Sequence, residues 1–595
     1  MPSHSTLVTT MAYPRISAFL AVGLLALAFS HPAAAVQVKG EAAKSSTKAA
    51  PALQWRSGNF PASGVAKLGL TELAPERIAK LHSYNADDSK IKPMQIGIAR
   101  DVARDAAQPM PSLKWQLLSN GAKVSRIAVT SPDAFGLRVG VRTSGLALGS
   151  ELRFSGSSDP DLVTAFATGA QTKRLIDERN LYWTPVTEGE TQYIEIYLPK
   201  GVLAAPVHFD IISTSHLLTN AKENFVIEKA SGSCEVNVIC SVAALGTNFV
   251  NAKNAVARIT FVSGGSTFLC TGTVLNDTAA ATQIPYFYTA NHCISSQTIA
   301  STINTFWNYE ATGCPNTSGL GTFTQQTGGA VYLYSDPDTS GTSTANGTDT
   351  SFVRLNDAPP AGAFFAGWDS TALGNIAVTA IHHPQGDAKK VSQGTKKSQS
   401  TKLQTMWWSS GSTEGGSSGS GLFTIGAGGA YYLRGGLYRG SASCSNTGTN
   451  TSANSDDYSR LDVSYPSIQQ WLAPTVTNGP TVNHTGPWYN PAESGWGLTW
   501  FDGYANNNHF GLMFIYTGTG TPDWYEFAGT WTGSDVHSGN LKKNSGPNFG
   551  TTFDPSQVVK TPVGTYTLTF TSATAATLTF TVGGVTRTNI PLTKL

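Results

Sequence analysis

The chain has 595 residues, only 13% of them charged, and a formal net charge of +2. The near balance of charge gives no indication of binding to nucleic acid or to an anionic membrane. The length is too great for one hydrophobic core, so several domains are expected. Glycine is abundant, and after about residue 110 threonine, valine, serine and aromatic residues dominate, a composition that favours an all-β protein.

The N-terminus has the features of an export signal. Arg15 precedes an apolar run over 16–29, and small residues ending at Ala35 provide a cleavage site. The run is shorter than the roughly 20 residues that cross a bilayer. No other segment is long and apolar enough to do so, and we therefore expect no transmembrane span. We expect residues 1–35 to be a signal peptide and the protein to be secreted, extracellular or periplasmic, where disulfides persist.

Residues 36–229 divide into two parts. The first, to about residue 110, is rich in alanine, lysine and serine with weak periodicity, and we expect it to be loosely ordered. From about residue 114 apolar and polar residues alternate in short runs, such as 123–129, 136–142 and 192–198, which predicts a small β-sandwich. Its position after an export signal favours a propeptide over a purely structural module.

All six cysteines lie in one region, which we place at 230–473. An even number of cysteines in one domain of an exported chain predicts disulfides, and the sequence alone leaves their pairing open. A metal cluster is the alternative. The sequence has no C-x-x-C or H-E-x-x-H pattern, so we expect no metal and no cofactor.

Three stretches of this region indicate nucleophilic catalysis. Residues 415–421 read G-G-S-S-G-S-G, a loop in which small residues would let a substrate carbonyl approach Ser418. A flexible linker is the alternative interpretation. His292 follows an apolar run, and Asp349 opens the run D-T-S-F-V-R-L. The order His292, Asp349, Ser418 is that of chymotrypsin-type double β-barrels.

Longer motifs in this region carry a resemblance to a known family. They are S-G-S-C-E-V-N-V-I-C at 231–240, L-C-T-G-T at 269–273, T-A-N-H-C at 289–293, F-W-N-Y at 306–309, A-G-W-D at 366–369, A-I-H-H-P at 380–384 and T-E-G-G-S-S-G-S at 413–420. With these motifs the region resembles the bacterial lysyl endopeptidases, a disulfide-bonded branch of the chymotrypsin-fold serine proteases. The resemblance implies a chymotrypsin-like double β-barrel.

The resemblance also implies a role for each catalytic candidate. Ser418 would be the nucleophile, His292 the base that takes its proton, and Asp349 the acid that orients the imidazole. The N–H groups of Gly416 and Ser418 would form the oxyanion hole. A core position is the alternative for His292. Only Asp349 opens an apolar run, whereas the other acids between His292 and Ser418 do not: Asp336, Asp338, Asp357 and Asp369.

Two further features follow from the resemblance. The His382-His383 pair could suggest a metal, but no third ligand lies at useful spacing, and the family carries this pair structurally. The implied disulfides are Cys234–Cys444, Cys240–Cys314 and Cys270–Cys293. The last bridge would hold the loop of His292 on the neighbouring strand.

Substrate preference in the family comes from a pocket beside the serine. Family members select lysine with an aspartate late in the domain, and the match over 455–460 places this acid at Asp456. A buried carboxylate facing an ammonium disfavours uncharged side chains, which would leave the acid unpaired. The alternative for Asp456 is a solvated loop acid. Thr413 would lie at the pocket base, where the neighbouring Glu414 could assist.

The sequence departs from the family pattern at two positions of the cleft wall. Tyr438 stands where better-known members have histidine, and Arg439 where they have glycine. An aromatic ring at 438 can still cover the cleft. Arg439 is expected to narrow the pocket mouth or to repel a cationic side chain.

The expected start of the mature enzyme falls at Lys229-Ala230. A lysine at this place fits self-processing by an enzyme that cuts after lysine, and it equally fits a trypsin-like host protease. We expect residues 36–229, the chain's own propeptide, to assist folding and to block the cleft until they are removed.

The remaining residues form a separate part of the chain. Residues 474–485 are rich in proline, threonine and asparagine and are expected to be a linker. Residues 486–595 contain alternating runs at 566–570 and 576–580, which predict a small β domain of unknown role. Its aromatic residues either fill the core or stack on sugars or polymer surfaces.

The sequence therefore predicts a secreted, monomeric serine endopeptidase that cuts protein or peptide substrates after lysine, with arginine as a second option. Two alternatives stay open. One is a serine protease with a different preference at the cleaved bond. The other is a catalytically silent surface-binding protein with a protease-like fold.

Overall fold

The computed structural model describes residues 36–44, 52–87, 91–220, 231–279, 283–315, 318–340, 345–446, 448, 451–474, 480, 482–503, 508–548, 550 and 554–595. The expected signal peptide ending at Ala35 and the expected processing site at Lys229 and Ala230 lie outside these residues. Within the described part of the chain, no helix has both the length and the apolar character needed to cross a membrane.

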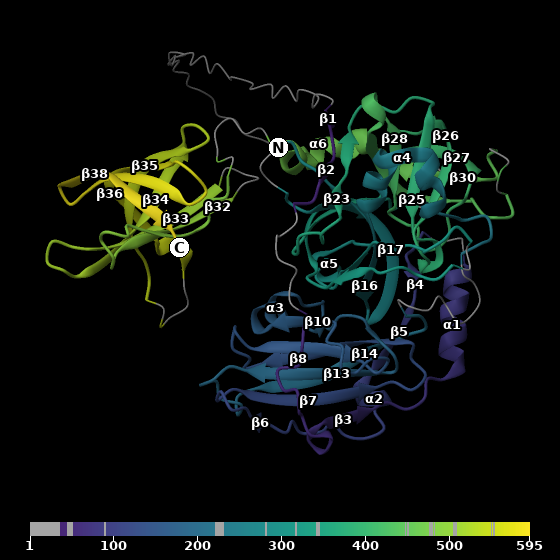
Figure 1. Cartoon of the computed structure of the whole chain (residues 1–595), viewed down its shortest axis with the longest axis horizontal. Helices are drawn as coiled ribbons and strands as arrows, with labels where there is room; N and C mark the ends of the chain where they lie inside the picture. The colour runs from purple at the N-terminus through teal and green to yellow at the C-terminus, as the bar shows by residue number, and fades with distance from the viewer. Residues whose placement is uncertain are drawn as a thin grey trace, which may run out of the picture. The chain divides into compact units, whose positions relative to one another are not determined.

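Two sheets form the N-terminal region (Figure 1). The first sheet contains β10 (Ala165–Thr168), β9 (Glu151–Gly156), β13 (Thr191–Leu198), β7 (Lys123–Thr130), β3 (Ala66–Gly69) and β6 (Gln116–Leu117). The second contains β11 (Tyr182–Trp183), β8 (Gly136–Ser144), β14 (His208–Leu217), β5 (Gly97–Asp101) and β12 (Thr187–Glu188). Alternate residues of β8 and β13, including Val139 and Ile194, are buried in one shared core, because successive side chains of a strand point to opposite faces.

Residues before 110 are more ordered than their composition predicts. Strands β3 and β5 belong to the two sheets, and two helices lie in this stretch, α1 (Pro75–Ala86) and α2 (Val102–Asp105), whereas α3 (Gly169–Arg174) follows β10 later in the region. The expectation of a loosely ordered segment is therefore wrong for these residues. Their order comes from pairing with strands distant in sequence, which leaves little local periodicity to read.

The cysteine-bearing region contains two larger sheets, the halves of the expected chymotrypsin-like arrangement. The first has β20 (Thr324–Gln326), β19 (Asn304–Trp307), β16 (Val256–Ser263), β17 (Ser266–Leu275), β18 (Tyr286–Ala290), β22 (Thr350–Leu355) and β21 (Ala330–Asp336). The second has β24 (Gly367–Asp369), β29 (Tyr431–Gly440), β28 (Gly421–Ile425), β25 (Ala377–His382), β26 (Lys390–Gln399), β27 (Leu403–Ser410), β30 (Ser455–Ser459) and β15 (Val236–Asn237). Three helices accompany them: α4 (Val238–Asn254), α5 (Gln297–Ala300) and α6 (Leu461–Leu472). The predicted all-β class is confirmed.

Short strands of the N-terminal region extend both of these sheets. Strand β4 (Met94–Gln95) pairs antiparallel with β17, at Phe268 and Leu269. Strand β1 (Gln37–Val38) pairs antiparallel with β24, and β2 (Glu41–Ala42) pairs antiparallel with β23 (Phe364–Phe365). The N-terminal region thus contributes a strand to each half of the cysteine-bearing region.

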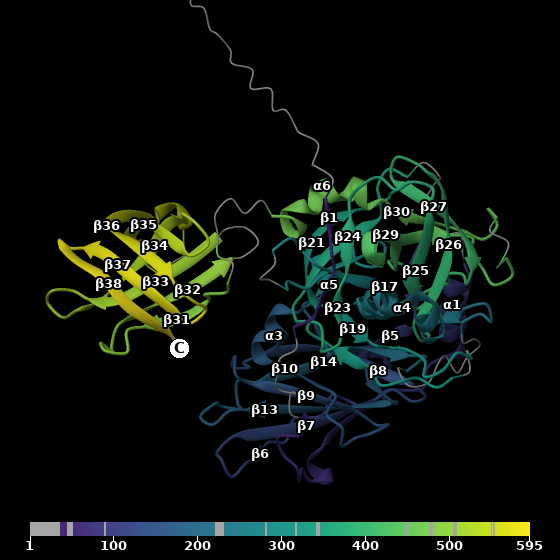
Figure 2. The same ribbon diagram turned by 45° about the horizontal axis from the view of Figure 1, so that its top comes forward.

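The C-terminal residues form a closed eight-stranded barrel (Figure 2). Its strands are β31 (Gly486–Tyr489), β32 (Gly497–Gly503), β33 (Asn508–Tyr516), β34 (Pro522–Trp531), β35 (Val536–Ser545), β36 (Val559–Phe570), β37 (Ala575–Val582) and β38 (Val585–Lys594). Three tryptophans, Trp488, Trp500 and Trp531, are buried in its core. Other large aromatic residues, including Phe514 and Trp524, are exposed. The core therefore holds only part of the aromatic residues of this domain.

The structure contains two of the three expected disulfides. Cys234 is bonded to Cys444, and Cys270 to Cys293. Cys240 and Cys314 are free thiols, which differs from the expected pairing. The two thiols are nevertheless in contact: burial and a hydrogen bond with Cys314 raise the pKa of Cys240 to about 11.

We expect mild oxidation to join Cys240 and Cys314, because their side chains already meet. The bridge would raise the free energy of unfolding by about 2–4 kcal/mol, the usual contribution of a disulfide. Alkylation of the denatured chain followed by mass spectrometry counts the free thiols before and after oxidation. Persistence of both thiols under an oxidising glutathione buffer would contradict this expectation, and Cys314→Ser controls for modification elsewhere.

Candidate active site

His292 and Asp349 are held together by the pairing of two strands. Residue Ala290, at the end of β18, lies opposite Thr350 at the start of β22. Asp349 therefore meets the loop that follows β18. The N–H of Asn291 donates to the Asp349 carbonyl (2.8 Å), and the N–H of His292 donates to Oδ1 of Asp349 (2.9 Å). Nδ1 of His292 lies 2.6 Å from Oδ2 of Asp349.

The Asp349 carboxylate is buried away from water. Burial raises the pKa of Asp349, and the interactions with His292 oppose this shift. The backbone of Asp349 is left-handed, with φ of 55°, a conformation that aspartate tolerates better than most residues. Nε2 of His292 is buried and has no hydrogen-bond partner among the described residues, so this nitrogen is available to a reacting group.

The loop of Ser418 follows β27 and turns at two glycines with positive φ, Gly416 (92°) and Gly419 (77°). The Thr271 hydroxyl donates to the Gly416 carbonyl (3.0 Å), and the Thr271 N–H donates to the Ser418 carbonyl (2.8 Å). Both carbonyls are thereby turned toward β17. The backbone N–H groups of Gly416 and Ser418 donate to no other backbone group of the described chain.

The Ser418 loop packs directly on the loop of His292. A Cβ atom at Gly419 would lie 2.2 Å from Thr289 Oγ1 and 2.8 Å from the Ala290 nitrogen. Only glycine fits at this distance. The structure thus sets the Ser418 loop against the end of β18, which leads to His292, although no hydrogen bond joins His292 to Ser418 in the described residues. Catalytic hydrogen bonds are often long before substrate binds.

His382, the first residue of the His382-His383 pair, contacts the Ser418 loop at Ser417. Nδ1 of His382 lies 2.9 Å from the hydroxyl of Ser417, and Nε2 lies 3.0 Å from that of Ser392. Burial, with a smaller contribution from Lys390, lowers the pKa of His382 to about 3. A neutral His382 therefore positions the residue next to Ser418, in line with the structural role expected for this pair.

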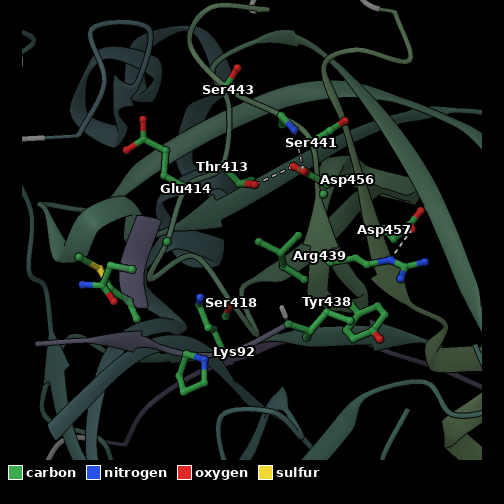
Figure 3. A pocket seen from close by; sticks show the side chains of 18 of the residues that line it. Lys92, Thr413, Glu414, Ser418, Tyr438, Arg439, Ser441, Ser443, Asp456 and Asp457 are labelled. Atoms are coloured by element: carbon green, nitrogen blue, oxygen red, sulfur yellow. Dashed lines mark hydrogen bonds and ion pairs between the residues drawn. The ribbon is translucent and has the colours of Figure 1, made fainter. Parts of the chain in front are cut away.

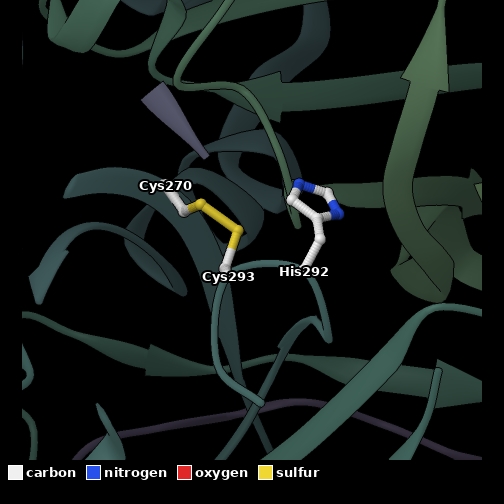
Figure 4. A group of neighbouring side chains, drawn as sticks. All are labelled: Cys270, His292 and Cys293. Atoms are coloured by element: carbon white, nitrogen blue, oxygen red, sulfur yellow. A yellow bond between two sulfur atoms is a disulfide. The ribbon is translucent and has the colours of Figure 1, made fainter. Parts of the chain in front are cut away.

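Neither cysteine cluster of the described chain is suited to a metal. Cys270, His292 and Cys293 lie close together, as do Cys234, Glu235 and Cys444. The sulfur atoms of both clusters are joined in disulfides, so no thiolate is available to bind a cation. Figure 4 shows His292 beside the Cys270–Cys293 bridge.

A cavity of about 810 Å³ opens beside Ser418 and contains all the predicted substrate-binding residues (Figure 3). Asp456 is buried at its wall, where Oδ2 accepts hydrogen bonds from Thr413 Oγ1 (2.7 Å) and Trp408 Nε1 (2.5 Å). Among the described residues no cation is paired with Asp456. Burial raises the pKa of Asp456 to about 7, so this site would favour a positively charged group. Asp456 is thus not a solvated loop acid.

Glu414 and Arg439 line the cavity, as expected from the sequence, but each is bound to a neighbouring group of the protein. Glu414 lines the cavity, but its Oε1 accepts the N–H of Gly232 (3.0 Å). Arg439 Nε donates to Oδ2 of Asp457 (3.2 Å), and its guanidinium lies over the ring of Tyr438. The positive charge of Arg439 is therefore compensated beside the pocket, and Figure 3 shows its side chain turned toward Asp457.

Tyr438 covers the cleft between the two sheets. Its ring centroid lies 6.4 Å from that of His292, and its hydroxyl donates to Oδ2 of Asp338. Asp338 belongs to the loop between β21 and β22. No local sequence pattern indicates this role of Asp338, because the contact joins residues 100 positions apart in the chain.

A segment of the N-terminal region that no sequence motif indicated lines the same cavity. Asn85, Asp87 and residues 91–94 lie there with Ser418 and Asp456. Nζ of Lys92 donates to the Asp87 carbonyl and lies 4.5 Å from the ring centroid of Tyr84. Lys92 is followed by Pro93. The lysine is thus paired within its own segment.

Two family profiles match the N-terminal region and the cysteine-bearing region of the chain. One, described as the C-terminal domain of lysyl endopeptidase, matches residues 228–459. The other, the lysyl endopeptidase N-terminal domain, matches residues 69–218. A lysyl endopeptidase of Pseudomonas aeruginosa is 32% identical over 403 residues, covering 64% of this chain and 82% of the relative.

The chain belongs to the lysyl endopeptidase family. It is accordingly a serine endopeptidase. Solved structures similar to the chain include the protease Anisep of Arthrobacter nicotinovorans, with 17% identity over 35% of this chain and 91% of that one, at a TM-score of 0.25. Another is a Mycobacterium tuberculosis protease in its active form, with 13% identity over 42% and 92% of the two chains, at a TM-score of 0.25. At these scores neither neighbour adds to the family assignment.

We expect Asp349→Asn to lower kcat roughly 10⁴-fold with little change in KM, the size of effect typical for loss of the orienting carboxylate. The asparagine amide carries no negative charge and has only one acceptor oxygen, so it cannot accept both the backbone and the ring hydrogen bond of His292. The measurement is steady-state hydrolysis of a peptide ester by the processed enzyme. Asp462→Asn, which removes a carboxylate paired with Arg460 at helix α6, is the matched control. A loss below tenfold would contradict the assignment.

Proposed function

We propose that this chain is secreted as an inactive precursor and, once processed, hydrolyses peptide bonds after lysine through His292, Asp349 and Ser418. The observation that carries the proposal is the buried Asp456, which lies without a cationic partner among the described residues in the cavity beside Ser418. The two disulfides support export to an oxidising compartment.

The chemistry assigns one step to each residue. Ser418 Oγ attacks the substrate carbonyl while Nε2 of His292 takes its proton, and His292 then gives that proton to the leaving amine. Water, deprotonated by His292, hydrolyses the acyl-enzyme and restores Ser418. Asp349 keeps the proton of the neutral imidazole on Nδ1 and stabilises the imidazolium that forms. The close contact of Asp349 with Nδ1 supports this assignment.

The oxyanion of each tetrahedral intermediate needs two hydrogen-bond donors. The N–H groups of Gly416 and Ser418 are the candidates, because the carbonyls of both residues are engaged by Thr271 on the other side of the loop. One such donor is typically worth about 3 kcal/mol of transition-state stabilisation.

The preference for lysine rests on the energetics of a buried carboxyl group. An ammonium entering the pocket gives Asp456 the partner that it lacks, whereas an uncharged side chain leaves the acid unpaired or protonated. Thr413 and Trp408 hold the acid in place. Arg439, because it is paired with Asp457, does not oppose the entry of a cation as strongly as the sequence suggests.

The precursor form is supported by the segment that enters the cleft. Met94 pairs with Leu269 of β17, next to the disulfide-bonded Cys270. The preceding residues line the cavity with Ser418 and would obstruct a substrate. Lys92 does not reach Asp456, since its ammonium is bound by Asp87. Inhibition would therefore come from blocking the cleft and not from filling the lysine pocket.

One experiment separates the proposal from its alternatives. Processed enzyme is treated with a fluorophosphonate probe, and its cleavage sites are mapped on a denatured protein. Labelling that Ser418→Ala abolishes, with cuts confined to bonds after lysine or arginine, is the expected result. Absence of labelling would favour a silent binding protein, and cuts after neutral or acidic residues would assign a different preference.

The pH dependence of lysine selectivity should report on Asp456. Its pKa of about 7 in the empty pocket means that at lower pH the acid is neutral and must lose a proton to receive an ammonium. We expect the ratio of kcat/KM for lysine and norleucine peptides to fall by up to about tenfold per pH unit below pH 7, and to be constant well above it.

Taking this ratio cancels every effect of pH that acts on both peptides alike. Asp456→Asn should remove the pH dependence of the ratio and most of the lysine preference. A wild-type ratio that stays constant between about pH 5 and pH 7 would count against a titrating Asp456.

A further inference from the structure

Residues 36–44 lie along one edge of the cysteine-bearing region, called the peptidase from here on. They are outside the residues that either family profile matches. The N–H of Val36 donates to Ser370 Oγ (2.9 Å), and the Ser370 N–H donates to the Val36 carbonyl (2.9 Å). At the other end the N–H of Ala43 donates to the Ala363 carbonyl (3.0 Å). Antiparallel pairing of β1 with β24 and of β2 with β23 fills the interval, and Figure 2 shows β1 beside β24.

Side chains also recognise this segment. Gln37 Nε2 donates to Oδ2 of Asp369 (2.9 Å). Gln283 donates from Nε2 to the Ala42 carbonyl (2.8 Å) and accepts the N–H of Lys44 at Oε1 (2.7 Å). One glutamine side chain thus binds the segment as a further strand would, through a donor and an acceptor.

Two glycines make the contact close. A Cβ atom at Gly40 would lie 2.6 Å from the Phe365 carbonyl oxygen and 2.8 Å from the Gly367 nitrogen. A Cβ atom at Gly367 would lie 2.6 Å from the Val38 carbonyl oxygen and 2.8 Å from the Gly40 nitrogen. The three nearest atoms to a Cβ at Gly367 would therefore all belong to the segment, so a methyl group there acts first on the segment.

The receiving edge has the properties of a strand-binding site. Strand β24 pairs with β29 on one side and with β1 on the other. Without residues 36–44, the second side of β24 would present unpaired N–H and C=O groups, the feature that proteins use to bind an extended peptide.

The same region of the chain holds the peptidase at a second place. β4 pairs with β17, and Arg138 Nη2 donates to the Thr302 carbonyl (2.9 Å). Two linked contacts bind more tightly than either alone, because release of one leaves the other to hold the partner nearby. This bivalence matters after the covalent link between the two regions is cut.

We propose that the edge formed by β23 and β24 is a docking site for residues 36–44, and that it retains the N-terminal domain on the peptidase after processing. The inference rests on the proposed function in one respect, the cut between the two regions. It adds that removal of the inhibitor is a two-site release in which the segment must leave the β24 edge as well as the cleft.

The test uses the full chain in a Ser418→Ala background, with a recognition sequence for a site-specific protease inserted within 221–229. After cutting, the dissociation rate of the N-terminal fragment from the immobilised remainder is measured. Deletion of 36–44 should accelerate dissociation at least about tenfold. Gly40→Ala and Gly367→Ala should each accelerate it, whereas Gly58→Ala, at a glycine with no atom within 4 Å of the added methyl group, should not.

A double variant and a peptide make the test specific. Once 36–44 are deleted, Gly367→Ala should have no further effect, and a labelled peptide of residues 36–44 should bind the deleted chain but bind it more weakly when Gly367 is alanine. Equal dissociation rates with and without 36–44, or an undiminished effect of Gly367→Ala in the deleted chain, would overturn the proposal.

The same deletion in the active chain separates this inference from the proposed function. A shorter lag before peptidase activity supports both. Faster dissociation with an unchanged lag supports the docking site and contradicts inhibition by the N-terminal domain. Retention is measured without catalysis, so an incorrect substrate assignment would leave its result intact.

Discussion

The carboxylate of Asp349 is the constraint on which the site depends. A buried charge is costly unless hydrogen bonds replace the water that it loses, and here the N–H and the ring of His292 supply them. These contacts exist only in the register that sets Ala290 opposite Thr350. The Cys270–Cys293 bridge then fixes the following residue to β17. The orientation of the imidazole is thus a consequence of strand pairing.

Strand β17 joins this constraint to the rest of the cleft. Its Thr271 holds the carbonyls of Gly416 and Ser418, and its Cys270 anchors the histidine loop. Its Leu269 pairs with Met94 of the N-terminal region. Three consecutive residues therefore hold the Ser418 loop, the His292 loop and the segment of the N-terminal region that lines the cavity. Asp456 differs from Asp349 in accepting its side-chain hydrogen bonds from a threonine and a tryptophan, which carry no charge at any ordinary pH, and burial raises its pKa to about 7.

Local patterns in the sequence predicted what local structure determines. The alternation at 123–129 and 192–198 became β7 and β13, and His292 and Asp349, which their motifs singled out, contact each other. The sequence could not predict contacts set by long-range register. Arg439 is neutralised by Asp457 on the paired strand β30, and β1 is a strand of two residues whose partner lies more than 300 positions away with no periodicity of its own.

The three proposed catalytic residues come from two sheets, His292 and Asp349 beside β18 and β22 and Ser418 between β27 and β28. The N-terminal region places β4 on one sheet and β1 on the other, and so it spans the division. During synthesis this region emerges first. Pairs of strands that are distant in sequence form slowly, because the entropy of closing the loop is lost before the strand contacts stabilise the fold. Because the N-terminal region pairs with both sheets, it would favour during folding the one relative placement of the two sheets in which both strand pairs can form.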